Sequence, residues 1–307
     1  MPRLTVVIVS WNVRELLASC LSSLFCDLEG ADVEASVQVV DNASVDGTPE
    51  MVSRAFPQVH LMASDENLGF AAGNNLALET ILRTRDAAPS GSFVWLLNPD
   101  TAVRTGATTA LLTALERTPT AGVAGAKLLY ADGSLQQSAF RFPGLLQLAF
   151  ELFPMPQRLY DTWLNGRYPR RLYAGERPFR VDHPLGASMM VRRQAIKEVG
   201  VLDEGYRMYC EEIDWCWRMQ EAGWDALCVP TAEIIHHAGQ STSQVPIQSF
   251  VDLWKSRARL YARHHARLTW RLARAMVGIG MRRRMADATP EMVEACQEVV
   301  RAWGRTG

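Results

Sequence analysis

Each of three short apolar runs in the first hundred residues ends in oxygen-bearing side chains. These are, in chain order, Ser10 with Asn12, Asp41 with Asn42, and Asn98 with Asp100. Open α/β sheets bind ligands at the carboxyl ends of their strands. A carboxylate there suits a hard divalent cation, and a nucleoside diphosphate would bring further oxygen ligands. The competing interpretation is that these residues only make turns or cap helices, and the rest of the chain must decide.

A second group of titratable side chains lies between residues 209 and 237. Glu211, Glu212 and Asp214 stand among tyrosine and tryptophan residues. Acidic residues also commonly complement the dipole at a helix N-terminus. Three carboxylates beside aromatic residues nevertheless favour a site that raises one pKa for base chemistry. His236 leaves a predicted strand and is a candidate metal ligand, with His237 as its neighbour.

Alternating strand and helix patterns must position these residues. Predicted strands at 4–10, 37–40, 60–62 and 93–97 alternate with helical patterns. The run at 93–97 has no polar alternation, which indicates a strand buried on both faces, and Pro99 ends it. This spacing predicts an α/β fold with a parallel, doubly wound sheet. The chain lacks a P-loop and a GxGxxG turn, which disfavours P-loop NTPases and dinucleotide dehydrogenases.

The second half continues the pattern less regularly. Further strands are expected at 122–130, 189–191, 226–230 and 233–235. Residues 140–182 contain five prolines and predict an irregular insertion with one short helix, 145–152. Such long irregular segments in compact domains tend to be functional loops.

The length and composition are those of a globular protein with one large domain and an appendage. The chain has 307 residues, 48% of them hydrophobic, and a formal net charge of −1. No apolar stretch approaches the roughly 18 residues of a membrane-spanning helix, and the run at 4–9 is too short for a signal peptide. The six cysteines show no CxxC pair, so a reduced cytoplasmic environment is expected.

The C-terminal residues 244–307 form a basic extension. Between Lys255 and Arg284 the chain carries many arginines and no acidic residue, and apolar residues are interleaved with them. This pattern predicts basic amphipathic helices over 246–284. They either cover the large domain or bind an anionic membrane surface. Nucleic acid is disfavoured because no recognised motif accompanies the arginines. A closing helix at 290–302 is a candidate for homodimerisation.

Seven sequence elements resemble one family in its own order. They are VVIVSWN, VVDNASVDGT, NLGFAAGNN, WLLNPDT, GASMMVRR, LDEGYRMYCEEIDWCWR and IIHHAGQS. The chain therefore resembles an inverting family-2 glycosyltransferase of the GT-A fold, in the rhamnosyltransferase-like branch, over about residues 4–243. The resemblance implies a mostly parallel central sheet flanked by helices. It also implies a catalytic domain at 1–243, with a nucleotide-binding half at 1–130 and an acceptor half at 131–243.

The resemblance implies roles for particular residues. The positions that match donor-nucleotide binding are Ser10, Trp11, Asn12, Asp41, Asn42, Ser44, Asn67, Gly69, Asn74 (or Asn75) and Asn98. Asp41 matches the acid that hydrogen-bonds the base. Asp100 matches the last acid of the family's DxD motif, and His236 its downstream metal ligand, which implies Mg²⁺ or Mn²⁺. Glu212 matches the catalytic base, with Asp214 as the alternative.

The implied activity is transfer of a sugar with inversion onto a cell-surface glycan or lipid-linked acceptor, and the branch implies L-rhamnose from dTDP-L-rhamnose. Two alternatives stay open at this point. One is a UDP-sugar transferase for galactofuranose or hexose, and the other is a nucleotide-sugar-binding protein without turnover. The second arises because Asn98 and Glu212 depart from the family's usual acids. The expected location is the cytoplasm, with peripheral contact at the inner face of the membrane.

Overall fold

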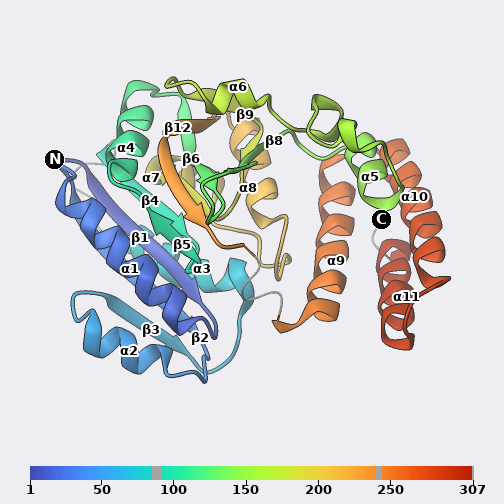
Figure 1. The fold of residues 1–307 in the computed structure, drawn as a ribbon, viewed down its shortest axis with the longest axis horizontal. Helices are drawn as coiled ribbons and strands as arrows, with labels where there is room; N and C mark the ends of the chain where they lie inside the picture. The colour runs from blue at the N-terminus through green and yellow to red at the C-terminus, as the bar shows by residue number, and fades with distance from the viewer. Residues whose placement is uncertain (85–90, 239–243, 306–307) are drawn as a thin grey trace.

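The computed structural model describes residues 1–84, 91–238 and 244–305. Gly239, Gln240 and Ser241 of the last family-like element, and the predicted domain boundary at 243, lie outside the described residues. The structure consists of an α/β body and a group of C-terminal helices that stands beside it (Figure 1).

One large mixed sheet forms the centre of the body. Along it the strands follow the order β3-β2-β1-β4-β11-β6-β12-β5, with β7 paired to β6 and β9 to β12. Their bounds are β1 (Arg3–Ser10), β2 (Glu34–Asn42), β3 (His60–Ser64), β4 (Ser92–Leu97), β5 (Thr101–Val103), β6 (Ala121–Leu129), β7 (Leu135–Gln136), β9 (Phe179–Val181), β11 (Ser188–Arg192) and β12 (Asp225–His236). A separate pair joins β8 (Ala139–Phe140) to β10 (His183–Pro184).

Helices cover both faces of the sheet. Those of the body are α1 (Arg14–Glu29), α2 (Thr48–Ala55), α3 (Gly69–Arg83), α4 (Ala107–Arg117), α7 (Arg193–Val199) and α8 (Glu211–Glu221). The strand β4 shows why two layers are needed. Phe93, Trp95 and Leu97 pack in the core with α1 and α4, whereas Val94 and Leu96 pack in the core with α3 and α8. The prediction of a strand buried on both faces is confirmed.

The direction of the strands is less uniform than the sequence pattern indicates. The strands β1, β2, β3 and β4 are parallel, but β11 runs antiparallel between β4 and β6. The two apolar runs predicted at 226–230 and 233–235 form one long strand, β12, with an irregular register between Val229 and Glu233. The sheet is therefore mostly parallel: β1 to β4 are parallel, and the antiparallel pairs lie in its second half.

The insertion at 140–182 contains more helix than the single one predicted. Besides α5 (Leu145–Leu152) it has the short helix α6 (Arg170–Tyr173) and 3₁₀ turns at Gln157–Leu159 and Trp163–Asn165. Helix α5 leaves the body and packs against the C-terminal helices. Its residue Leu148 is buried in their core.

The basic extension folds as three helices, α9 (Pro246–His264), α10 (Arg267–Met285) and α11 (Pro290–Arg305). Together with α5 they share a core rich in aromatic residues, including Trp254, Tyr261, Trp270 and Trp303. The apolar side of α11 is buried in this core, so the predicted homodimer would need another surface of that helix. Among the described residues, none of the helices combines the length and the apolar character needed to cross a membrane.

Candidate active site

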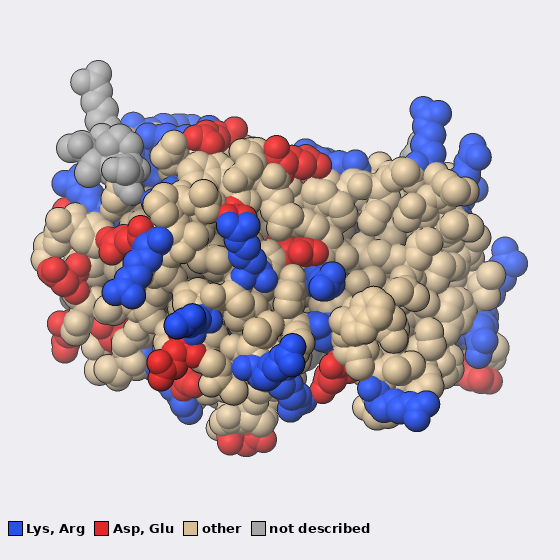
Figure 2. Space-filling view, turned by 90° about the horizontal axis from the view of Figure 1, so that it is seen from above, with Lys and Arg blue, Asp and Glu red and all other residues tan. Residues whose placement is uncertain are grey.

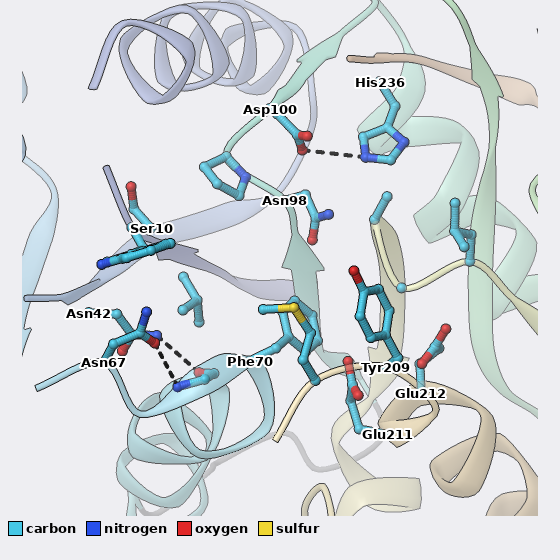
Figure 3. Close-up of a pocket in the computed structure, with 18 residues that line it drawn as sticks. Ser10, Asn42, Asn67, Phe70, Asn98, Asp100, Tyr209, Glu211, Glu212 and His236 are labelled. Atoms are coloured by element: carbon cyan, nitrogen blue, oxygen red, sulfur yellow. Dashed lines mark hydrogen bonds and ion pairs between the residues drawn. The ribbon is translucent and has the colours of Figure 1, made fainter. Parts of the chain in front are cut away.

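A pocket of about 270 Å³ opens at the carboxyl ends of β1, β2 and β4, where the sequence predicts a ligand site. It brings together residues from both halves of the body (Figure 3). Nine of the predicted site residues line it: Ser10, Trp11, Asn42, Asn67, Gly69, Asn98, Asp100, Glu212 and His236. Residues that are far apart in the sequence thus meet around one cavity.

Asp100 and His236 face each other at one side of the pocket (Figure 3). Oδ1 of Asp100 lies 3.4 Å from Nε2 of His236, and both side chains are nearly fully buried. Nδ1 of His236 lies 3.0 Å from Oε1 of Gln136, an acceptor, so Nδ1 carries the proton and donates it there. Nε2 of a neutral ring is then an acceptor that faces a carboxylate. Two acceptors at this separation suit a cation between them.

The metal-binding atoms of Asp100 and His236 fit a divalent cation for which the protein supplies only part of the coordination. Oδ1 of Asp100 has no hydrogen-bond partner although it is buried. Among the described residues, no group of three or more His, Cys, Asp or Glu side chains could hold a metal ion. Asp100 and His236 could therefore hold Mg²⁺ or Mn²⁺ only with further oxygen ligands, as a diphosphate provides.

Glu211 and Glu212 lie at the N-terminus of α8, opposite Asp100 and His236 (Figure 3). Tyr209 and Cys210, which precede the helix, adopt left-handed backbone angles with φ of 69° and 68°. Successive left-handed non-glycine residues are strained, and such strain is characteristic of functional sites. This turn brings Glu211 and Glu212 to the pocket wall.

Burial controls the protonation of both glutamates. Desolvation raises the pKa of Glu212 to about 7, and it raises the pKa of Glu211 well above its ordinary value, with repulsion from Glu212 adding to the effect. One carboxylate oxygen of each residue is buried without a hydrogen-bond partner. A carboxyl group with a pKa near neutrality is suited to general-base catalysis.

The opposite wall is built from the ends of β1 and β2 and the start of α3. The Asn42 amide donates to the carbonyl of Gly69 (3.0 Å), and the N–H of Gly69 donates to Oδ1 of Asn67 (3.0 Å). Gly69 has a φ of +82°, and a Cβ there would overlap the carbonyl of Arg207. Oγ of Ser10 and Oδ1 of Asn42 are buried without hydrogen-bond partners. They are free to bind a polar ligand.

Four predicted donor-binding residues are not among the described residues that line the cavity. Ser44 and Asn12 connect two loops, because the N–H of Asn12 donates to Oγ of Ser44 (2.9 Å). Oδ2 of Asp41 accepts the N–H of Ser44 (2.9 Å), while its Oδ1 is buried without a partner. Asn74 donates to the carbonyl of Phe70 (2.9 Å) within α3. The neighbouring Asn75, the other possibility at that position, binds the loop at Leu202 instead.

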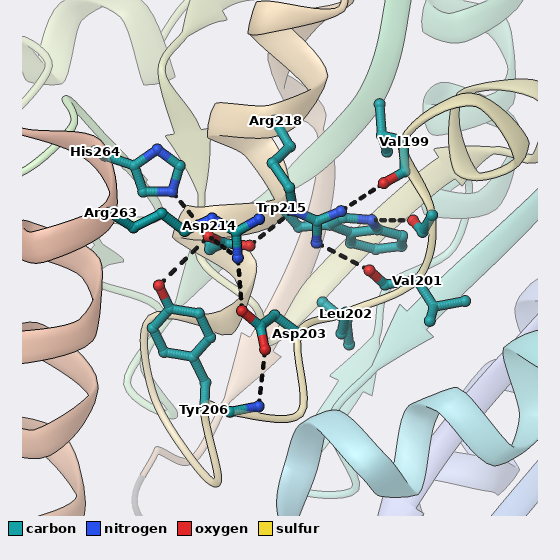
Figure 4. Close-up of polar contacts among 12 residues, drawn as sticks. Val199, Val201, Leu202, Asp203, Tyr206, Asp214, Trp215, Arg218, Arg263 and His264 are labelled. Atoms are coloured by element: carbon teal, nitrogen blue, oxygen red, sulfur yellow. Dashed lines mark hydrogen bonds and ion pairs between the residues drawn. The ribbon is translucent and has the colours of Figure 1, made fainter.

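Asp214 also lies away from the lining of the pocket, in a network of cations (Figure 4). Its side chain is fully buried and accepts hydrogen bonds from Nε of Arg218 and from Nε2 of His264, both at 2.8 Å. Arg263 lies 3.3 Å away, and the hydroxyl of Tyr206 donates to the same carboxylate. Although burial opposes it, hydrogen bonds from His264 and Arg218 lower the pKa of Asp214. The contacts of this carboxylate therefore hold α8 against α9 and the loop before α8.

Two residues at the site had no role assigned from the sequence. Tyr209 lines the pocket between the two glutamates (Figure 3). It is adjacent to the acidic run, and that proximity is the signal that could have identified it. Gln136 orients His236 from a short hairpin 100 residues earlier in the chain. No local pattern connects these two residues.

Comparison with known proteins identifies the family. Residues 5–200, more than half of the chain, match the family model described as Glycosyl transferase family 2. The chain belongs to glycosyltransferase family 2. This family-2 glycosyltransferase is 33% identical over 269 residues to N-acetylglucosaminyl-diphospho-decaprenol L-rhamnosyltransferase of Mycobacterium tuberculosis, covering 86% of this chain and 85% of the relative. It is 23% identical over 252 residues to low-salt glycan biosynthesis hexosyltransferase Agl10 of Haloferax volcanii, covering 82% and 72% of the two chains.

Solved structures show the same fold at low sequence identity. The glycosyltransferase superposes on GalNAc-T7, solved with UDP, GalNAc and Mn²⁺, with a TM-score of 0.60 and 15% identity. That match covers 98% of this chain, which spans about half (54%) of GalNAc-T7. A mannosyltransferase from Pyrobaculum calidifontis, solved with GDP-Man and Mn²⁺, gives a TM-score of 0.56 at 16% identity and covers 100% and 76% of the two chains. The predicted GT-A fold is confirmed.

Proposed function

We propose that this family-2 glycosyltransferase transfers L-rhamnose from dTDP-L-rhamnose, with inversion, to a lipid-linked glycan acceptor. The observation that carries the mechanism is the placement of Glu212 in the same pocket as the facing pair Asp100 and His236. The identity to a rhamnosyltransferase over most of both chains supports the donor and the acceptor class.

In the proposed reaction the acceptor hydroxyl loses its proton to Glu212 while its oxygen attacks the anomeric carbon of the donor. The bond from that carbon to the diphosphate breaks in the same step, so the configuration inverts. We favour Glu212 over Asp214 because Glu212 lines the pocket and has a raised pKa, whereas Asp214 is buried among Arg218, Arg263 and His264.

Asp100 and His236 would hold Mg²⁺ or Mn²⁺, which when bound stabilises negative charge on the departing diphosphate. The nucleoside would extend toward the ends of β1 and β2. There Ser10 and Asn42 offer buried oxygens without partners, and Oδ1 of Asp41, also without a partner, would accept a hydrogen bond from the nucleobase of the donor. These assignments account for buried polar atoms that the protein itself leaves unpaired.

A UDP-sugar donor is the second candidate, and the relative named as a hexosyltransferase favours it. Thermal stabilisation by dTDP, UDP and GDP, each with and without Mn²⁺, separates the two. Selective, metal-dependent stabilisation by dTDP is expected. A preference for UDP would replace rhamnose by a hexose or galactofuranose, and no response to any nucleotide would contradict the assignment of Asp41 and Asp100.

The Glu212→Gln variant tests the catalytic role. Removing a general base lowers kcat by about 10²–10⁴-fold, whereas the nucleotide-induced thermal shift should persist. Glu50→Gln, at an exposed position of α2, is the matched control and should leave turnover unchanged. If the wild-type chain binds donor but never turns it over with any acceptor, the non-catalytic binding protein would be the better description.

The exposed face of α10 supports a peripheral contact with an anionic membrane, where a lipid-linked acceptor would lie. Leu268, Leu272 and Ile279 are 70%, 47% and 52% exposed and share one side of the helix. Exposed arginines flank them, and α10 contains no acidic residue. Figure 2 shows blue side chains projecting from the end of the molecule formed by the C-terminal helices. Apolar residues bordered by cations are typical of helices that lie in a membrane interface.

A further inference from the structure

A second cavity, the chamber, adjoins the pocket of about 270 Å³ described above, which we call the donor pocket. Its volume is about 260 Å³, and it shares Leu185, Tyr209 and Glu212 with the donor pocket. Most of its other lining residues come from the insertion and from helix α9, among them Phe140 and Tyr261. The proposed base therefore lines both of two adjacent cavities.

Three arginines line this chamber: Arg141, Arg167 and Arg257. The guanidinium of Arg167 lies 4.4 Å from the centroid of the Phe140 ring, and its Nε is buried without a hydrogen-bond partner. In the described part of the chain, Arg141 contacts the ring of Tyr168 at 5.8 Å and forms no ion pair. Among the described residues neither guanidinium forms an ion pair, although the charge of Asp161, which is paired with Arg170 outside the chamber lining, acts on Arg167.

Arg257 is the exception, because Glu151 forms an ion pair with it. Only 19% of the Arg257 side chain is exposed, and its guanidinium also lies 4.8 Å from the ring centroid of Trp254. Glu151 and Glu212 are the carboxylates among the described lining residues. Glu151 is already neutralised, so the chamber carries a net positive charge that a neutral sugar would not require.

We propose that this chamber binds the phosphate groups of an anionic acceptor, a sugar diphosphate ester, with Arg167 and Arg141 as its principal ligands. The proposal rests on the glycosyltransferase function proposed above. Guanidinium groups bind phosphate oxygens through paired N–H donors, and a partly enclosed site strengthens the attraction. The sugar would lie between the arginines and Glu212, so that its hydroxyl would meet the donor beside Glu212, where the two cavities adjoin.

The binding test compares a charged probe with its neutral counterpart. The charged probe is undecyl N-acetylglucosaminyl diphosphate, and the neutral one is undecyl N-acetylglucosaminide. Each is titrated by tryptophan fluorescence in EDTA, so that metal-dependent binding in the donor pocket does not contribute. We expect the wild-type chain to bind the diphosphate at least about tenfold more tightly, since hydrogen bonds to charged groups have effects of this size.

Variants assign that preference to the chamber. Arg167→Gln should lose most of it, and Arg141→Gln should lose part, while Arg158→Gln, an exposed arginine of the same insertion, should retain it. Equal affinity for both probes, or an unchanged preference in both chamber variants with intact thermal midpoints, would overturn the proposal.

N-acetylglucosamine 1-phosphate, as a third probe, distinguishes a free sugar phosphate from a lipid-linked one. If it binds as tightly as the undecyl ester, the acceptor is a free sugar phosphate rather than a lipid-linked one.

The donor measurements keep the two proposals separate. If nucleotides stabilise the protein with Mn²⁺ but the probes bind equally, the chamber proposal fails and the transferase function stands. If no nucleotide stabilises it while the probes still show Arg167-dependent affinity, the chamber stands and the proposed donor site fails.

Discussion

Glu212 is the residue whose protonation should set the pH dependence of the reaction. As a base it must be a carboxylate, and burial raises its pKa to about 7. We therefore predict that kcat/KM rises with pH through about 7 and levels off above it. Initial rates in overlapping buffers from pH 5 to 9 measure this. A rate that is already constant between pH 5 and 6 would show that the base is a carboxylate with an ordinary pKa.

Gln136 should determine how well His236 binds a metal ion. Its Oε1 accepts the Nδ1 proton of His236, which leaves Nε2 directed at Asp100. Removing a residue that orients a metal ligand typically weakens metal affinity by about 10–100-fold. The Gln136→Leu variant should show that loss, relative to the wild-type chain, in Mn²⁺ titrations with saturating dTDP followed by electron paramagnetic resonance.

Its neighbour Gln137 provides the control. Both polar atoms of the Gln137 side chain are buried without hydrogen-bond partners, so Gln137→Leu removes nothing from His236. Similar Mn²⁺ affinities in the two variants would rule out the orienting role of Gln136.

At the scale of elements, helix α9 holds the segment that carries the glutamates. Arg259 and Arg263 of α9 form ion pairs with Asp203. The hydroxyl of Ser256 donates to the carbonyl of Met208 (2.8 Å). His264, at the end of the helix, forms a hydrogen bond with Asp214. These contacts come from the C-terminal helices, yet they fix the strained turn that precedes α8. The basic extension thus supports the segment that carries the proposed catalytic base.

Asp214→Asn tests this connection through stability. Breaking a buried ion pair costs about 3–5 kcal/mol, so urea unfolding at pH 7 should show a loss of that order. The pKa of Asp214 is lowered in the folded state, so its stabilisation is present above the unfolded pKa of about 3.9 and is lost as pH falls through the native value. The difference between wild type and variant should therefore shrink in acid.

An exposed aspartate serves as the comparison for that experiment. Asp65→Asn changes the same charge at a position on the surface and should leave the unfolding free energy within about 0.5 kcal/mol. A loss at Asp214 no larger than the loss at Asp65 would mean that the network does not stabilise α8.

At the scale of the whole molecule, the C-terminal helices should contact a membrane while the pocket in the α/β body binds the sugar nucleotide. We predict that the chain sediments with vesicles containing anionic lipid and that salt weakens this binding, because screening acts on exposed arginines. Replacing Leu268 and Leu272 together by Ser should reduce the bound fraction several-fold. The control is Leu76→Ser, a 43% exposed leucine on α3. Equal binding of both variants, or of neutral vesicles, would contradict a membrane-facing α10.

The sequence by itself determined the features that depend on neighbours along the chain. The buried run at 93–97 and the polar strand ends follow from local propensity and hydrophobic periodicity. The order of the family-like elements then indicated which strand ends belong to one site. Nine predicted residues, among them Asp100 and Glu212, do line a common pocket.

Only the tertiary structure decided the contacts between distant segments. It paired Gln136 with His236 and Asp214 with His264, and it packed α5 with the C-terminal helices. Asp214 and Glu212 look alike in the sequence, two residues apart in one acidic run. On a helix those positions point to different sides, so one enters the pocket and the other enters a network of cations. Periodicity records which face is buried, whereas the partner on that face depends on the packing of segments far away in the chain.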